Sequence, residues 1–201
     1  MGDEVDILAL MEREEGRKKL VRGYKILGFE ENPLVPCRGV VAKLDAELGD
    51  VIPVLFLMNI GKASYIPGEK VLTIREGGRL ITFYPDGRVS LNRAWTEEAA
   101  RRALDDVVKM VNEAYAELLR YGPPDEEELR KALRLSWKDV LDVLPGENCG
   151  KCGRETCYSF AIDVLRGKAR LSECTPLIKS WERTSKARER LGHRIARALG
   201  L

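Results

Sequence analysis

The chain has 201 residues, of which 44% are hydrophobic and 33% are charged, proportions typical of a globular protein with one compact core. Its longest apolar run, Val51 to Ile60, is too short to cross a membrane, and Pro53 interrupts it, so a membrane-spanning helix is excluded. The first six residues include three acids where a signal peptide would carry positive charge. We therefore expect a cytoplasmic protein.

The formal net charge is only +2, which excludes a molecule that binds nucleic acid through its overall charge. This balance hides an asymmetry along the chain. Residues 149–201 contain 12 Lys and Arg against 5 Asp and Glu, a net +7, which leaves 22 against 27, a net −5, for residues 1–148. The chain has no Gln, one His and many Glu, Arg and Lys residues, a bias typical of thermophilic proteins.

The N-terminal half predicts a helix followed mainly by strands. From Asp3 to about Tyr24, apolar residues recur at helical spacing among charged ones, which predicts a helix. Residues 30–36 contain two prolines and are expected to form a connector. Strands are expected at residues 37–44, 51–58, 70–75, 79–84 and 88–92. Gly77-Gly78 and Pro85-Asp86-Gly87 separate the last three of these, which indicates an antiparallel meander.

A long helix follows the meander. Thr96 precedes two glutamates at a position suited to helix capping, and apolar residues then recur at helical spacing as far as Leu118. This order is similar to one repeat of the TATA-box-binding protein fold. The fold class expected is therefore α+β, with a curved antiparallel sheet covered by a long helix and followed by a small helical module.

Gly122-Pro123-Pro124 ends the long helix and marks the expected domain boundary, because a helix cannot continue through two prolines. The predicted domains are residues 1–121 and residues 125–201. Short helices are expected at residues 125–135 and 136–143, and a basic helix at residues 177–199.

Four of the five cysteines lie within 26 residues, whereas Cys37 is far upstream and is expected to be a buried, inert thiol. The four, with the spacing Cys-x2-Cys-x4-Cys-x16-Cys, are Cys149, Cys152, Cys157 and Cys174. A reducing cytoplasm favours metal ligation over disulfides. Four thiolates suit a tetrahedral zinc or a 4Fe-4S cluster, and the spacing alone leaves both open.

The segment from Leu144 to Leu177 resembles a known four-cysteine 4Fe-4S domain. The resemblance includes all four cysteines, the glycines after the first two, Asn148 before the first and Thr156 before the third. This domain occurs in the large subunit of the corrinoid iron-sulfur protein of acetyl-CoA synthase/CO dehydrogenase and in the B subunit of the Rnf electron-transport complex. The resemblance implies an oxygen-sensitive cluster bound by the four cysteines listed above.

From this resemblance we expect a protein that transfers single electrons to a partner enzyme in anaerobic, archaeal metabolism. A purely structural cluster is the alternative reading of the same residues. Two other functions are an accessory factor for corrinoid or methyl-transfer enzymes and a nucleic-acid-associated iron-sulfur protein. No motif of a complete enzyme is found, so a carrier or accessory subunit is favoured over a catalyst.

The basic helix at residues 177–199 has two interpretations. It could form a solvated face, or it could dock to an acidic redox partner or to nucleic acid through residues such as Arg190, Arg194 and Arg197. His193 in the same helix is expected to be a solvated residue and not a ligand.

Overall fold

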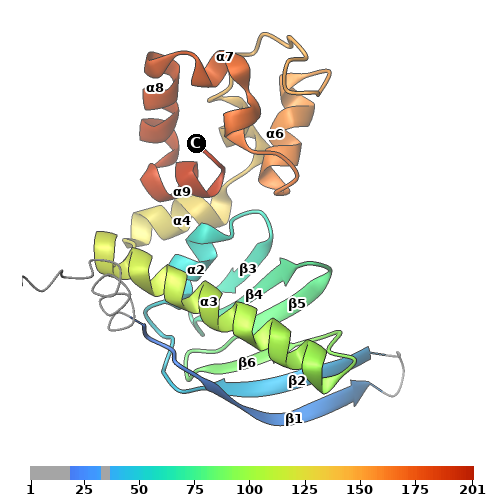
Figure 1. The fold of residues 1–201 in the computed structure, drawn as a ribbon. Coiled ribbons are helices and arrows are strands. Elements are labelled where there is room, and N and C mark those ends of the chain that lie inside the picture. The colour runs from blue at the N-terminus through green and yellow to red at the C-terminus, as the bar shows by residue number, and fades with distance from the viewer. Residues whose placement is uncertain (1–18, 33–36) are drawn as a thin grey trace, which may run out of the picture.

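A computed structural model describes residues 19–32 and 37–201 (Figure 1). Its sheet has six antiparallel strands in the order β1-β2-β6-β5-β4-β3. The strands are β1 (Tyr24–Asn32), β2 (Cys37–Leu44), β3 (Ala63–Ile66), β4 (Val71–Glu76), β5 (Arg79–Phe83) and β6 (Arg88–Leu91). The helices are α2 (Ile52–Met58), α3 (Glu97–Tyr121), α4 (Glu126–Arg134), α5 (Trp137–Leu141), α6 (Cys157–Leu165), η1 (Leu171–Glu173), α7 (Thr175–Ile178), α8 (Trp181–Leu191) and α9 (His193–Ala198).

The predicted meander is confirmed as β4, β5 and β6. Gly77 and Gly78 join β4 to β5 with φ of 55° and 77°, the left-handed conformations that a tight hairpin turn requires. In β4, Leu72 and Ile74 are fully buried while Val71 and Thr73 are partly exposed, so alternate side chains face the core.

Helix α3 lies across one face of the sheet, as expected (Figure 1). The Thr96 hydroxyl accepts a hydrogen bond of 3.1 Å from the Ala99 N–H, and Gly122 ends the helix with a φ of 74°. A single apolar stripe is buried, consisting of Ala100, Ala103, Leu104, Val107, Val111 and Ala114. The α+β class is therefore confirmed.

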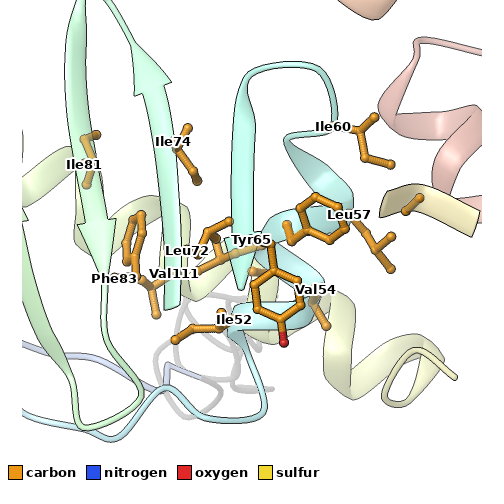
Figure 2. Packing of buried hydrophobic residues seen from close by; sticks show 14 of the residues in the cluster. Ile52, Val54, Leu57, Ile60, Tyr65, Leu72, Ile74, Ile81, Phe83 and Val111 are labelled. Carbon is orange, nitrogen blue, oxygen red and sulfur yellow. The ribbon is translucent and has the colours of Figure 1, made fainter. Parts of the chain in front are cut away.

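The strand predicted at residues 51–58 is wrong, because this segment forms helix α2. Five of its seven residues are buried, so the helix is apolar on nearly every side and shows no helical periodicity. Pro53 lies in the first turn, where a missing N–H costs no hydrogen bond. Figure 2 shows Ile52, Val54 and Leu57 of α2 within the core, beside residues of the sheet and Val111 of α3.

The start of the sheet also differs from the sequence prediction. Most of the helix predicted to end near Tyr24 lies outside the described residues, but Tyr24 itself begins strand β1. Glu30 and Asn32, predicted to lie in a connector, belong to the same strand. Strand β3 was not predicted, since it has only four residues and a single buried side chain, that of Tyr65.

The C-terminal residues form a set of short helices beyond α3 (Figure 1). The single basic helix predicted at residues 177–199 is wrong, because α7, α8 and α9 are separated near Ser180 and Gly192. Gly192 has a φ of 89°, which no continuous helix allows. None of the described helices has the length and apolar character needed to span a membrane.

The sheet and the C-terminal helices share one continuous hydrophobic core. Helix α2 contacts α3 on one side and α9 and α4 on the other. Gly61, just after α2, approaches α6 so closely that a Cβ atom on it would lie 1.9 Å from the Leu165 carbonyl oxygen. Gly61 also has a φ of 90°, so glycine is required there for two reasons.

Replacing Gly61 with Ala should destabilise the protein by about 2–4 kcal/mol, because the methyl group forces α6 away from the end of α2. The matched control is Gly77→Ala, which places a methyl group in open space at a φ of 55°. Its cost should be about 1–2 kcal/mol of backbone strain. Chemical denaturation of both variants measures the difference, and equal costs would contradict the packing described here.

Candidate metal centre

The four predicted cysteine ligands line a single hollow at the far end of the C-terminal helices. They are Cys149, Cys152, Cys157 and Cys174, and all four are free thiols. Cys149 is exposed and Cys174 is only 6% exposed, so the hollow runs from the surface into the core. The remaining lining is formed by Asn148, Gly150, Arg154, Thr156, Phe160 and Pro176.

The loop that carries the first two cysteines makes repeated left-handed turns. Asn148, Gly150 and Gly153 have φ of 45°, 69° and 76°, and the Gly153 N–H donates to the Gly150 carbonyl at 2.9 Å. A Cβ on Gly153 would meet no atom within 4 Å. Glycine is therefore required here for its backbone conformation and not to relieve crowding.

Asn148 closes this loop onto the third cysteine. Its Oδ1 accepts a hydrogen bond of 2.8 Å from the Cys157 backbone N–H. Asparagine tolerates a positive φ better than most residues, so one side chain provides both the turn and the bond. The resemblance noted in the sequence included Asn148, but its hydrogen bond is visible only in the structure.

Cys157 is the first residue of α6. Thr156 caps this helix, and its hydroxyl accepts a hydrogen bond of 3.1 Å from the Ser159 N–H. The N-terminal end of a helix stabilises negative charge and therefore favours the thiolate that a metal requires. Helix α6 was not predicted from the sequence.

Cys174 lies between η1 and α7 and approaches the hollow from a different direction in the chain. Its carbonyl accepts hydrogen bonds from the N–H groups of Leu177 and Ile178, at 3.0 and 3.1 Å. Burial raises the pKa of the Cys174 thiol, a hydrogen bond from the Leu177 N–H lowers it, and repulsion from the other three cysteines raises it further. The four sulfurs are thus close enough to interact electrostatically.

Across residues 19–32 and 37–201, no three or more His, Cys, Asp or Glu side chains are arranged to hold a single metal ion.

A second layer of contacts fixes the cysteine loop to the helices. Arg154 donates to the Asp163 carboxylate at 2.6 Å, which lowers the pKa of Asp163 and raises that of Arg154. Arg183 on α8 forms an ion pair of 2.8 Å with Glu147, immediately before the loop. These partners were not predicted, because nothing in the local sequence links an arginine to an acid 9 or 36 residues away.

The three arginines considered for partner docking form ion pairs with acids elsewhere in the protein. Arg190 pairs with Asp142 at 2.6 Å, Arg194 with Glu128 at 2.9 Å, and Arg197 with Glu117. His193 packs against Tyr121, with 5.5 Å between the ring centroids, and does not line the hollow. Arg194 is only 10% exposed, whereas Arg190 and Arg197 remain 60% and 41% exposed and still face solvent.

Residues 144–176 match a family described as "Putative Fe-S cluster". This segment contains all four cysteines of the hollow. The resemblance inferred from the sequence is confirmed, and the match supports an iron-sulfur cofactor. No solved structure gives a significant match to the chain.

Curated relatives match over a similarly short stretch. The gamma subunit of the acetyl-CoA decarbonylase/synthase complex of Archaeoglobus fulgidus is 38% identical over 53 residues, 26% of this chain and 11% of the relative. The corrinoid/iron-sulfur protein large subunit of Moorella thermoacetica is 42% identical over 40 residues, 20% of this chain and 9% of the relative. The chain therefore spans about a tenth of the length of these relatives.

Replacing Asn148 with Ala should speed the loss of iron to a chelator several-fold. Alanine tolerates the positive φ at this position less well than asparagine, and it cannot accept the hydrogen bond from the Cys157 N–H. Asn148→Gly keeps the backbone conformation and loses only the hydrogen bond, so it should lie between the wild type and Asn148→Ala. Anaerobic chelation monitored by absorbance measures the rates. Equal rates in all three proteins would show that Asn148 does not support the centre.

Proposed function

We propose that Cys149, Cys152, Cys157 and Cys174 hold one 4Fe-4S cluster and that the protein exchanges single electrons with a partner enzyme. The observation that carries the proposal is the convergence of all four thiols on one hollow within the segment that matches the iron-sulfur family. Such a cluster, when bound, supplies one-electron redox chemistry. The protein's own residues bind it, shield it and connect it to the surface.

The number of thiols favours electron transfer over catalysis at the metal. A 4Fe-4S cluster takes one thiolate on each iron, so four cysteines leave no iron open to a substrate. Radical chemistry with S-adenosylmethionine and Lewis-acid hydration both need such an open position. The donor set therefore supports a carrier and not a catalytic cluster.

The burial of the lining residues supports a redox role over a purely structural one. Phe160 is 1% exposed and Cys174 is 6% exposed, so one side of the hollow is dry. Cys149 on the opposite side is exposed. A site that is dry inside and open at one edge protects the sulfurs from solvent while it lets a partner approach.

The relatives suggest the kind of partner. Their names describe a subunit of the acetyl-CoA decarbonylase/synthase complex and a corrinoid/iron-sulfur protein. We infer that the partner is an enzyme complex of this chemistry, acting in an anaerobic cytoplasm. A corrinoid protein as the partner is the second candidate, favoured by the Moorella thermoacetica relative. Nucleic acid is not favoured as the partner, because the net charge of the whole chain is only +2.

We also propose a division of labour between two domains. The family match lies entirely within residues 125–201, and residues 1–121 share no part of it. The proposed cluster would therefore belong to the C-terminal domain, while the sheet and α3 of the N-terminal domain recognise the partner. Affinity capture with the full chain would show which partner binds, a corrinoid protein or a redox enzyme. Capture with a chain lacking a cluster cysteine would show whether this binding depends on the cluster.

Protein purified without oxygen should contain about four irons and four acid-labile sulfides per chain. Changing Cys149, Cys152, Cys157 or Cys174 to Ser one at a time should lower the iron content in each case, because each thiolate serves a different iron. Cys37→Ser is the matched control and should keep its iron. One tightly held zinc per chain, or full iron in any of the four variants, would contradict the cluster assignment.

The centre should accept one electron per chain in an anaerobic titration with a low-potential reductant. The reduced form should give an electron paramagnetic resonance signal that is absent from the oxidised form. A cluster that takes up no electron between about −700 and +450 mV, the range of known iron-sulfur potentials, would be a structural element only.

A further inference from the structure

Arg154 is the one residue with a permanent charge among the described residues that line the cysteine hollow. Its guanidinium group is held at two points. Nη1 donates a long hydrogen bond of 3.4 Å to the Cys152 carbonyl oxygen, and Nε donates to the Asp163 carboxylate at 2.6 Å. A positive charge is therefore fixed beside one of the four cysteines.

The partner of this charge lies away from the hollow. Asp163 belongs to α6, the helix that begins at Cys157, and is not part of the lining. The side chains of Arg154 and Asp163 are only 30% and 25% exposed, so solvent and salt screen this ion pair less than a pair on the open surface. Of the two charges, the positive one borders the hollow.

The guanidinium charge also acts on a cysteine sulfur. The pKa of Arg154 is raised chiefly by its hydrogen bond to Asp163, burial opposes this, and the charges of Asp163, Glu173 and Cys152 raise the pKa further. The Cys152 sulfur is therefore within electrostatic range of the guanidinium. Reduction adds one electron, and so one negative charge, to an iron-sulfur cluster. A positive charge nearby stabilises the reduced form more than the oxidised form, which raises the reduction potential.

We propose that Arg154 sets the reduction potential of the cluster and that Asp163 positions the Arg154 guanidinium beside Cys152. This inference rests on the proposed function, because it requires a redox-active cluster on the four cysteines. An external reductant gives one electron to the oxidised cluster, an acceptor takes that electron back, and no bond to Arg154 forms or breaks. The guanidinium stays protonated throughout, so it acts through its charge alone.

Two substitutions in the pair should move the potential in opposite directions. Arg154→Gln removes the positive charge and leaves the Asp163 carboxylate unpaired. The equilibrium constant for reduction should fall about tenfold, which is about 59 mV towards lower potential for a one-electron couple. Asp163→Asn removes the negative charge and keeps an oxygen that can accept from Nε of Arg154, so the potential should rise. An anaerobic titration with dithionite, followed by electron paramagnetic resonance, measures both shifts.

Arg154→Lys and Arg190→Gln are the matched controls. Lysine keeps the positive charge, so the potential of Arg154→Lys should stay closer to the wild-type value than that of Arg154→Gln. Arg190 pairs with Asp142 and does not line the hollow, so Arg190→Gln should leave the potential unchanged. Iron content and visible absorption show, before each titration, whether the cluster of a variant is intact.

The outcomes distinguish this inference from the proposed function. Wild-type protein without four irons, or with a cluster that cannot be reduced, overturns both. An intact, reducible cluster with the same potential in the wild type and Arg154→Gln contradicts the role of Arg154 alone, and so does a shift in the same direction in Arg154→Gln and Asp163→Asn. If Arg154→Gln loses its cluster, the rise expected in Asp163→Asn decides the question, and its absence overturns the inference.

Discussion

Four thiols must come together at one point, and much of the C-terminal architecture follows from this constraint. Thiolates repel one another, and burial opposes the charged form of Cys174, so the arrangement does not form by side-chain attraction. The backbone imposes it instead. Left-handed turns at Asn148, Gly150 and Gly153 fold the first two cysteines back, and the start of α6 presents the third. A bound cluster would turn this repulsion into ligation.

The helices that hold the cysteines depend in turn on α2. This short helix is buried among the sheet, α3, α4 and α9, so it connects both halves of the chain through one core. Gly61 lets the end of α2 meet α6, the helix that begins at Cys157. Ion pairs from Arg194 to Glu128 and from Arg197 to Glu117 reinforce the same junction.

The sequence predicted those features that depend on local pattern. Thr96 and Gly122 bound α3 because capping and left-handed termination act over a few residues. The cysteine spacing with its neighbours singled out four residues that the structure places around one hollow. Helix α2 was not predicted because a helix that is buried on nearly all sides is apolar throughout, so its sequence shows no hydrophobic periodicity of 3.6 residues. The contacts of Asn148 with Cys157, of Arg154 with Asp163 and of the three arginines with distant acids depend on tertiary folding, which no local pattern encodes.

The central claim is that the four cysteines hold a single four-iron cluster. Mössbauer spectroscopy of protein grown on ⁵⁷Fe and purified without oxygen tests this claim most directly, because it reports the number, valence and coupling of the irons. The account predicts that about four irons per chain form one coupled, diamagnetic cluster of mixed valence in the oxidised state. Isolated iron, a two-iron spectrum, or a colourless protein with zinc in place of iron would contradict it.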